Sequence, residues 1–253
     1  MINKSHLKRK IKRIPLKLSD SLSTSQLIHL IEKLVMRRVN KLYPAEALRF
    51  LFSLEHLFYR VQGRQAIAYD GGMHTKHRHI RYHDFFSKHI HKDETALDLG
   101  CGTGSVAYHV AKETQANVVG IDKNPYHLSI AIERHAHPKV QYIFGDILQI
   151  QPNGRFDVII LSNILEHIVQ RVEFLTTLQR VIIPKRFLIR VPLFERDWRV
   201  PLKKELGVEW RLDLDHKTEY TLESFAEEMR QANLKITYQE VRWSEIWAEV
   251  SNS

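Results

Sequence analysis

The chain has 253 residues, a single cysteine and a formal net charge of +9 at pH 7. A chain of this length forms one large domain or a domain with an extension, and the lone thiol, Cys101, excludes a disulfide framework and a cysteine-based metal cluster. This cysteine usage is typical of the reducing cytoplasm. The sequence lacks an apolar run long enough to cross a membrane and a signal-type apolar core after Met1, so we expect a cytoplasmic protein.

Positive charge is concentrated at the N-terminal end. Residues 1–94 contain 19 Lys and Arg against 8 Asp and Glu, a balance of +11, whereas the remainder carries 19 basic and 21 acidic residues, a balance of −2. We expect residues 1–20 to be a basic, flexible tail. Peripheral contact with an acidic membrane surface, or binding of nucleic acid, is the alternative for this tail. Aromatic residues that would stack on bases do not interleave the basic run, so nucleic acid is not favoured.

Residues 21–92 are predicted to form a helical extension. One apolar helix face is marked by residues at three- and four-residue steps, namely Leu27, Leu30, Ile31, Leu34 and Val35. A second helix is expected from Pro44 through Phe58. We expect these two helices to pack on each other and on the following domain, with a cap over the substrate as the alternative.

A histidine-rich segment, residues 74–91, follows the break at Gly71-Gly72. Its spacing matches no recognised zinc pattern, so solvated or hydrogen-bonded histidines are expected. The alternative is that Lys76, His77, Arg78 and Tyr82 border a ligand pocket just before the first strand.

The stretch from Ala96 to Gly104 carries the strongest local signal in the chain. An apolar run with one acid, Asp98, leads into glycines at alternate positions, Gly100, Gly102 and Gly104. The pattern predicts a buried strand and then a loop whose backbone closely approaches a ligand. The third glycine comes one residue too early for a dinucleotide fingerprint, and no P-loop lysine follows. An acid beside such a loop favours a ligand with a cationic end.

Further apolar runs end in polar groups at Asp122, at Asp146 and at Ser162. Strands are expected near 95–100, 117–122, 140–146, 155–162 and 186–192, with helices near 104–114, 125–136 and 171–181. This alternation predicts an α/β fold, in which ligands bind at the carboxyl ends of the strands. Asp122 is placed to accept hydrogen bonds from both hydroxyls of a ribose.

Residues 193–220 are too long and too rich in aromatic and charged groups for a plain connection, and we interpret them as a specificity insertion. A helix is expected from Thr221 to about Asn233. Two strands, Lys235–Val241 and Glu245–Val250, are expected to close the chain.

Four motifs, DLGCGTG, GID, GDI and FDVIILSNILEH, together resemble the class I S-adenosylmethionine-dependent methyltransferases over roughly residues 90–250. Within that class, the chain resembles the broad small-molecule branch that includes the ubiquinone-biosynthesis O-methyltransferases. The resemblance implies a Rossmann-like fold with a seven-stranded, mostly parallel sheet of order 3-2-1-4-5-7-6, formed here by residues 93–253, with S-adenosylmethionine as the cofactor.

The resemblance also implies a cofactor-binding role for ten residues. Asp98 and the loop through Gly100, Cys101, Gly102 and Gly104 would hold the methionine part. Asp122 with Lys123 would take the ribose, and Asp146 with Ile147 would meet the adenine. Ser162 would lie beside the sulfonium.

Methyl transfer from a sulfonium requires alignment of the nucleophile and exclusion of water. An oxygen or nitrogen nucleophile must also lose a proton, for which histidine is the usual base. The candidates are His216, which Asp213 and Asp215 would orient, and His167, which follows the fourth strand. An exposed loop position for His216 and a purely structural role for His167 are the alternatives.

Related ubiquinone-type enzymes carry Glu-x-x-Glu-His at 163–167 and can use it for a divalent metal. Asn163 replaces the first glutamate here, so no metal is predicted. The leading hypothesis is transfer of a methyl group to oxygen of a small-molecule, lipid or glycan acceptor. An RNA or protein methyltransferase guided by the basic N-terminus and a non-catalytic S-adenosylmethionine-binding module are the alternatives. Methylation of amino groups on DNA or RNA bases is disfavoured because Ser162–Leu165 is not an Asn-Pro-Pro-Tyr type of tetrapeptide. Methylation of carbon 5 of pyrimidines is disfavoured because the chain has no spare cysteine to act as the nucleophile.

Overall fold

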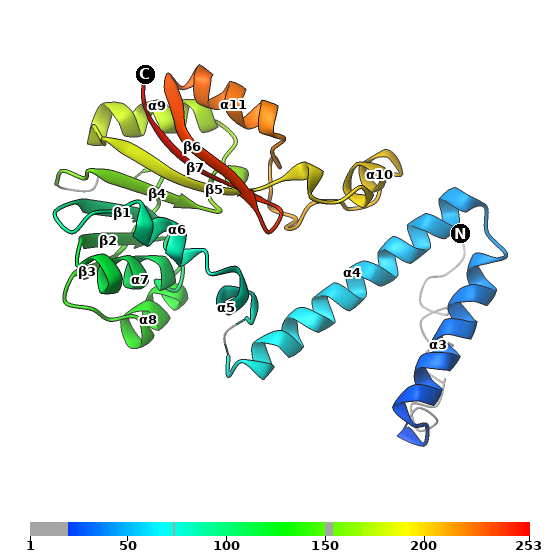
Figure 1. The fold of residues 1–253 in the computed structure, drawn as a ribbon. Helices are drawn as coiled ribbons and strands as arrows, with labels where there is room; N and C mark the ends of the chain where they lie inside the picture. Colours follow the sequence, from blue (N-terminus) through cyan, green and yellow to red (C-terminus); the bar gives the residue numbers. More distant parts are fainter. Residues whose placement is uncertain (1–19, 73, 150–153) are drawn as a thin grey trace. The chain divides into compact units, whose positions relative to one another are not determined.

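The computed structural model describes residues 20–72, 74–149 and 154–253 of the chain (Figure 1). The chain divides into two compact units, Met1–Arg60 and Val61–Ser253. Apart from Asp20, the expected basic tail lies outside the described residues.

The first unit contains α3 (Thr24–Val39) and the beginning of α4 (Pro44–Tyr69), which confirms both predicted helices. Ser23 begins α3 with a capping box, in which its side chain accepts from the Gln26 N–H and the Gln26 side chain accepts from the Ser23 N–H. None of the 16 residues of α3 is buried, although the helix carries the apolar face that the sequence predicts. The packing of this helix on the following domain stays a prediction.

The second unit is built on a seven-stranded sheet of order β3-β2-β1-β4-β5-β7-β6, as predicted (Figure 1). The strands β1 to β5 are parallel, and β7 runs antiparallel to both β5 and β6. The strands are β1 (Thr95–Leu99), β2 (Asn117–Asp122), β3 (Val140–Phe144), β4 (Val158–Ser162), β5 (Arg186–Pro192), β6 (Leu234–Arg242) and β7 (Glu245–Asn252).

Helices cover both faces of the sheet (Figure 1). On one side are α6 (His83–Lys88), α7 (Ser105–Thr114) and α8 (Pro125–Arg134), preceded by the short α5 (Lys76–Ile80). On the other are α9 (Arg171–Ile182) and α11 (Leu222–Gln231). The residues of β1 alternate between the two cores, because Leu97 and Leu99 pack with α9 and α11 whereas Ala96 packs with α6 and α7. The acid Asp98 therefore lies on the α7 face of the most central part of the sheet.

The sheet unit begins earlier in the chain than the predicted boundary at residue 93. Tyr82, Phe85, Phe86 and Ile90 are buried in the core cluster that includes Trp247 of β7. These aromatic side chains of α6 and its flanks cover one face of the sheet, so the segment belongs with that unit and not with the helical extension.

The segment after β5 forms the 3-10 turn η2 (Phe194–Arg196) and the helix α10 (Arg199–Glu205), followed by a stretch without regular structure up to Tyr220. A second 3-10 turn, η1 (Leu165–His167), follows β4. Both turns leave the sheet at the carboxyl ends of parallel strands, where the fold class places ligands.

Replacing Gly104 with alanine is expected to lower the free energy of unfolding by ~1–3 kcal/mol more than replacing Gly207. Both glycines have left-handed φ values, +80° and +66°, so both substitutions strain the backbone. Only at Gly104 would the new methyl meet the Tyr142 hydroxyl and, at 2.8 Å, the Ala131 methyl. Urea unfolding of the two variants measures the difference, and equal losses would contradict tight packing at Gly104.

Candidate cofactor and acceptor site

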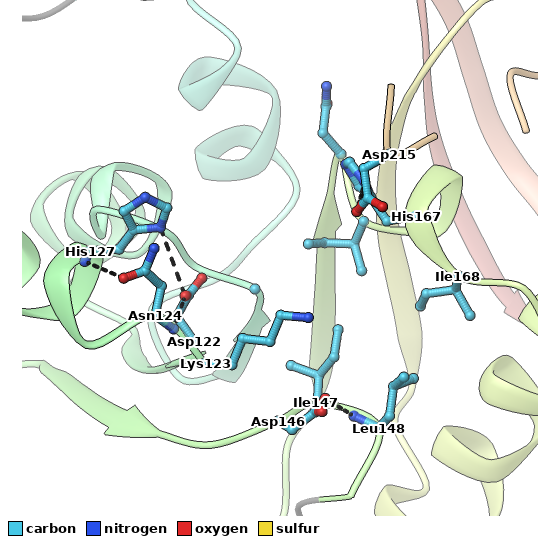
Figure 2. Close-up of a pocket in the computed structure, with 13 residues that line it drawn as sticks. Asp122, Lys123, Asn124, His127, Asp146, Ile147, Leu148, His167, Ile168 and Asp215 are labelled. Carbon is cyan, nitrogen blue, oxygen red and sulfur yellow. Dashed lines mark hydrogen bonds and ion pairs between the residues drawn. The ribbon is translucent and has the colours of Figure 1, made fainter. Parts of the chain in front are cut away.

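A cavity of about 340 Å³ lies at the carboxyl ends of β1 to β4 (Figure 2). Six of the predicted site residues line it, namely Gly100, Asp122, Lys123, Asp146, Ile147 and His167. The rest of the lining lies outside the predicted cofactor-binding and catalytic residues, although Asp215 was expected to orient one of them, and comprises Asn124, His127, Leu148, Asn163, Ile164, Ile168 and Asp215. Figure 2 shows Asp122, Asn124 and His127 on one side of this space and His167, Ile168 and Asp215 on the other.

Asp122 fixes the geometry of the cavity by joining two loops. Its Oδ2 accepts from the Gly102 N–H at 2.8 Å, and its Oδ1 accepts from the Asn124 N–H at 2.8 Å. A carboxylate has about four lone-pair positions, so each oxygen can accept another hydrogen bond from a ligand. The loop after β1 is therefore held against the end of β2 by the same side chain that faces the cavity.

The glycine loop offers bare main chain at Gly102. Its φ is +54°, and within the described chain no heavy atom lies within 4 Å of the position that a Cβ would take. At Gly100, whose φ is +72°, a Cβ would instead collide with the Ile164 side chain, so the loop is packed closely against the turn after β4. The loop thus leaves room for a ligand beside Gly102 while the surrounding chain is fixed.

Asp98 is buried directly beneath this loop, with an exposed fraction of 1%. Its Oδ2 finds no hydrogen-bond partner in the part of the chain that is described. Burial, reinforced by the negative charge of Asp122, raises the pKa of Asp98 to about 7. A buried carboxylate with one oxygen free of partners, beside a bare backbone, fits a ligand with a cationic amino group, as the methionine end of S-adenosylmethionine has.

The third wall of the cavity follows β3. The Oδ1 of Asp146 accepts from the Leu148 N–H at 3.0 Å, which closes a tight turn and directs Ile147 and Leu148 to the cavity. A carboxylate flanked by apolar side chains suits a flat heterocycle with an exocyclic amino group.

The remaining predicted cofactor residues do not line the cavity. Cys101 is buried, and Gly104 is crowded by Tyr142. The Ser162 hydroxyl accepts from the Nη1 of Arg190 at 3.3 Å, and Arg190 is itself paired with Glu245 at 2.6 Å. The next residue, Asn163, lines the cavity and has a left-handed φ of +58°.

His167 and His216 come together across 49 positions of sequence, with ring centroids 4.8 Å apart. His167 lines the cavity, whereas His216 is buried behind it with an exposed fraction of 5%. The exposed loop position considered for His216 is therefore wrong.

The acids that hold these two histidines differ from the predicted ones. The Nδ1 of His216 lies 3.0 Å from the Oε1 of Glu219, which also pairs with Arg196. Asp215 lies instead 3.4 Å from the Nδ1 of His167. The sequence prediction that Asp213 and Asp215 orient His216 is thus wrong, because Glu219 lies beside the His216 ring and Asp215 lies beside His167.

Glu166 is the middle residue of the turn η1, next to His167. Its exposed fraction is 0%, and among residues 20–72, 74–149 and 154–253 neither carboxylate oxygen has a hydrogen-bond partner. Burial raises the pKa of Glu166 to about 8. Its backbone oxygen accepts from the Lys217 N–H at 2.7 Å and from the Thr218 N–H at 3.3 Å. These two bonds hold the 213–219 segment on η1.

The histidine-rich segment is hydrogen-bonded, as predicted, and does not line this cavity. His83 lies 2.8 Å from the Ser105 hydroxyl and stacks on His109, and His77 lies 2.7 Å from the Tyr82 hydroxyl. Burial lowers the pKa of His83 to about 3 and that of His77 to about 4. Both rings are therefore neutral at pH 7.

The sheet order and the acids at successive strand ends define a class I S-adenosylmethionine-dependent methyltransferase. The profile of a family described as "Methyltransferase domain" matches residues 90–242, and the chain belongs to that family.

The relatives share this domain but not a substrate. The chain is 32% identical over 95 residues to ajmaline N-methyltransferase of Rauvolfia serpentina, covering 36% of this chain and 33% of that protein. It is 27% identical over 119 residues to the ubiquinone biosynthesis O-methyltransferase of Bradyrhizobium diazoefficiens, covering 46% of each. The chain thus spans less than half the length of these relatives.

Among solved structures, magnesium protoporphyrin IX methyltransferase of Synechocystis PCC 6803 with bound SAH superposes with a TM-score of 0.56 at 16% identity. The superposition covers 69% of this chain and 84% of that one. At this identity the likeness shows the fold alone. Among the described residues, no helix is both long and apolar enough to span a membrane.

Proposed function

We propose that this protein transfers the methyl group of S-adenosylmethionine to an oxygen atom of a small-molecule acceptor bound beside His167. The observation that carries the proposal is the cavity itself, in which Asp122 and Asp146 follow neighbouring strands beside the glycine loop and His167 lies across from them, backed by the buried His216. Lipid and glycan acceptors belong to the same proposal, provided that one hydroxyl reaches His167.

Different residues of the chain would bind different parts of the cofactor. Asp122 would accept the ribose hydroxyls, and Asp146 the adenine amino group. Asp98 would face the amino group of the methionine end across the Gly102 backbone, with Lys123 and Ile147 completing the lining. When bound, S-adenosylmethionine supplies a methyl group already activated by its positive sulfur.

The histidine side of the cavity would prepare the acceptor. A hydroxyl must lose its proton as it is methylated, and polar groups at fixed positions lower the cost of that loss. Glu166, His167 and His216 supply such groups, and Ile164 and Ile168 supply apolar wall that excludes water. The relatives named above methylate nitrogen in one case and oxygen in the other. Membership of the family therefore does not determine which atom of the acceptor is methylated, and we propose that the residues around His167 determine it.

The decisive experiment is product analysis. The protein is incubated with S-adenosylmethionine and a panel of phenols, aliphatic alcohols and amines, and the methylated products are identified by mass spectrometry. An O-methylated product that an Asp122→Ala variant fails to form supports the proposal. Methylation confined to amines, or to added RNA or protein, would overturn it.

The Asp98→Asn variant is expected to lose the pH dependence of cofactor binding. Because the pKa of Asp98 is raised to about 7, the carboxyl is mostly protonated at lower pH and charged at higher pH. A cationic amino group prefers the charged form, so the affinity of the native protein for S-adenosylhomocysteine should rise several-fold between about pH 6 and about pH 7.5. Calorimetric titration at each pH measures this, and a native profile as flat as that of the variant would remove Asp98 from the site.

A further inference from the structure

We infer that α3 binds the surface of an anionic lipid bilayer through its apolar face. Within the described chain, none of the 16 residues of this helix is buried. Aliphatic residues recur at three- and four-residue steps and so share one face of the helix, namely Leu27, Ile28, Leu30, Ile31, Leu34, Val35 and Val39. A continuous apolar face that is open to water marks a surface that a partner covers.

The aliphatic side chains of this face are unusually exposed. Ile28 is 61% exposed and Leu34 is 59% exposed. The helix nevertheless begins firmly, because the capping box at Ser23 satisfies backbone N–H groups of its first turn. The local sequence therefore favours the helix even where its apolar face has no partner.

Charge identifies the kind of partner. Residues 1–41 carry 11 Lys and Arg against 2 Asp and Glu, a balance of +9, whereas residues 42–253 carry 27 of each and are neutral. The whole net charge of the protein thus belongs to the segment that contains α3. Such a segment attracts an anionic partner.

The basic residues of α3 are placed as in helices that lie in a membrane surface. Lys33 is on the face opposite the aliphatic residues, and Arg37 and Arg38 are in the last turn. Long basic side chains reach lipid headgroups while the aliphatic face enters the acyl region. An apolar helix face combined with a polybasic segment supplies the two signals that stable membrane binding needs.

Other partners satisfy only one of the two properties. Nucleic acid would match the charge but would leave the aliphatic face in water, and residues 1–41 contain no Phe, Trp or Tyr that could stack on bases. A second copy of this chain would cover the aliphatic face but would bring together two segments of charge +9. An anionic bilayer offers negative headgroups beside an apolar interior, and so matches both.

The test is sedimentation of the full-length protein with vesicles of phosphatidylcholine alone and with vesicles that contain about 30% phosphatidylserine. We expect at least about tenfold tighter binding to the anionic vesicles. Most of that difference should disappear when NaCl is raised from about 0.1 M to about 0.5 M, because salt screens the charges. Binding to vesicles does not depend on the proposed methyl transfer and can be measured without cofactor or acceptor.

Ile28→Glu places a charge on the apolar face and should bind the anionic vesicles at least about tenfold more weakly than the native protein. Ile132→Glu is the matched control, since Ile132 on α8 is also 61% exposed and the net charge changes equally. This control should bind as the native protein does. Both variants should keep the native melting temperature, because neither side chain is buried.

Equal affinity for the two kinds of vesicle, absence of binding, or equal losses in Ile28→Glu and Ile132→Glu would overturn the inference. A lower melting temperature in Ile28→Glu alone would also overturn it, because the face would then pack on the following domain. An oligomer that Ile28→Glu dissociates, seen by analytical ultracentrifugation, would assign the face to a second copy, and binding of bulk RNA in place of vesicles would assign the charge to nucleic acid.

Titration of the native protein with S-adenosylhomocysteine separates the two proposals. Intact nucleoside binding without vesicle binding rejects the membrane surface alone. Vesicle binding without nucleoside binding rejects the proposed function alone.

Discussion

The His216→Ala variant is expected to turn over S-adenosylmethionine about 100- to 1,000-fold more slowly than the native protein while binding S-adenosylhomocysteine with the same affinity. His216 is buried against His167 and does not line the cofactor side of the cavity. Its loss would therefore impair activation of the acceptor and leave the nucleoside contacts in place. Steady-state turnover and calorimetry on the same preparation measure the two effects.

Two further variants test how His216 is held. Glu219→Gln replaces the carboxylate beside the Nδ1 of His216 with a neutral amide and so weakens their hydrogen bond. Turnover should therefore fall by about tenfold or more. Asp213→Asn alters an acid that is also three positions from His216 but is exposed, and its turnover should match that of the native protein. Slow turnover in Asp213→Asn together with normal turnover in Glu219→Gln would contradict the observed pairing.

The Asp122→Ala variant is expected to bind S-adenosylhomocysteine about 10- to 100-fold more weakly, which corresponds to ~1–3 kcal/mol. The carboxylate would accept from the ribose hydroxyls, and it also holds the backbone N–H groups of Gly102 and Asn124. Part of the loss would therefore arise from loosening of the glycine loop. Calorimetric titration measures the affinity directly.

Asp122→Asn separates these contributions, because the amide keeps one oxygen acceptor but loses the charge. Its affinity should lie between those of the native protein and Asp122→Ala. Asp93→Ala removes an exposed acid just before β1 and is the matched control. Native affinity in Asp122→Ala would show that the ribose is held elsewhere.

The sheet could be predicted almost residue by residue. The five parallel strands carry apolar runs, four of which end in polar groups, and such runs are governed by local pattern and burial. β2 and β5 have the predicted bounds, and β1 and β3 differ only at their carboxyl ends. The order of the strands came from the resemblance, because periodicity does not encode which strands are neighbours.

The acceptor side of the site could be predicted only in part. His167 and His216 were identified as separate candidates, but their proximity depends on the path of residues 193–220, which lack a repeating pattern. The sequence also placed Asp215 beside His216, because nearest neighbours along the chain were taken as neighbours in space. In a tight turn the residue three positions later, Glu219, is the one that faces the ring.

Asn163 illustrates a different limit. The sequence analysis treated it as a missing glutamate, whereas the structure shows a left-handed residue that lines the cavity. Asparagine tolerates that backbone conformation better than other side chains with a Cβ. An asparagine directly after a buried strand was thus the signal that could have placed it in the site.

The hydrogen bonds from Lys217 and Thr218 to the Glu166 carbonyl join two stretches of the chain through main-chain atoms alone. Such bonds are indifferent to side-chain identity, so residues 193–220 can vary in composition without losing their anchorage on η1. Asp122 and Asp146, which we propose bind the nucleoside, lie elsewhere in the chain and would be unaffected by that variation. Under the prediction that residues 193–220 select the acceptor, changes within them would alter that choice and leave the proposed contacts to the methyl donor in place.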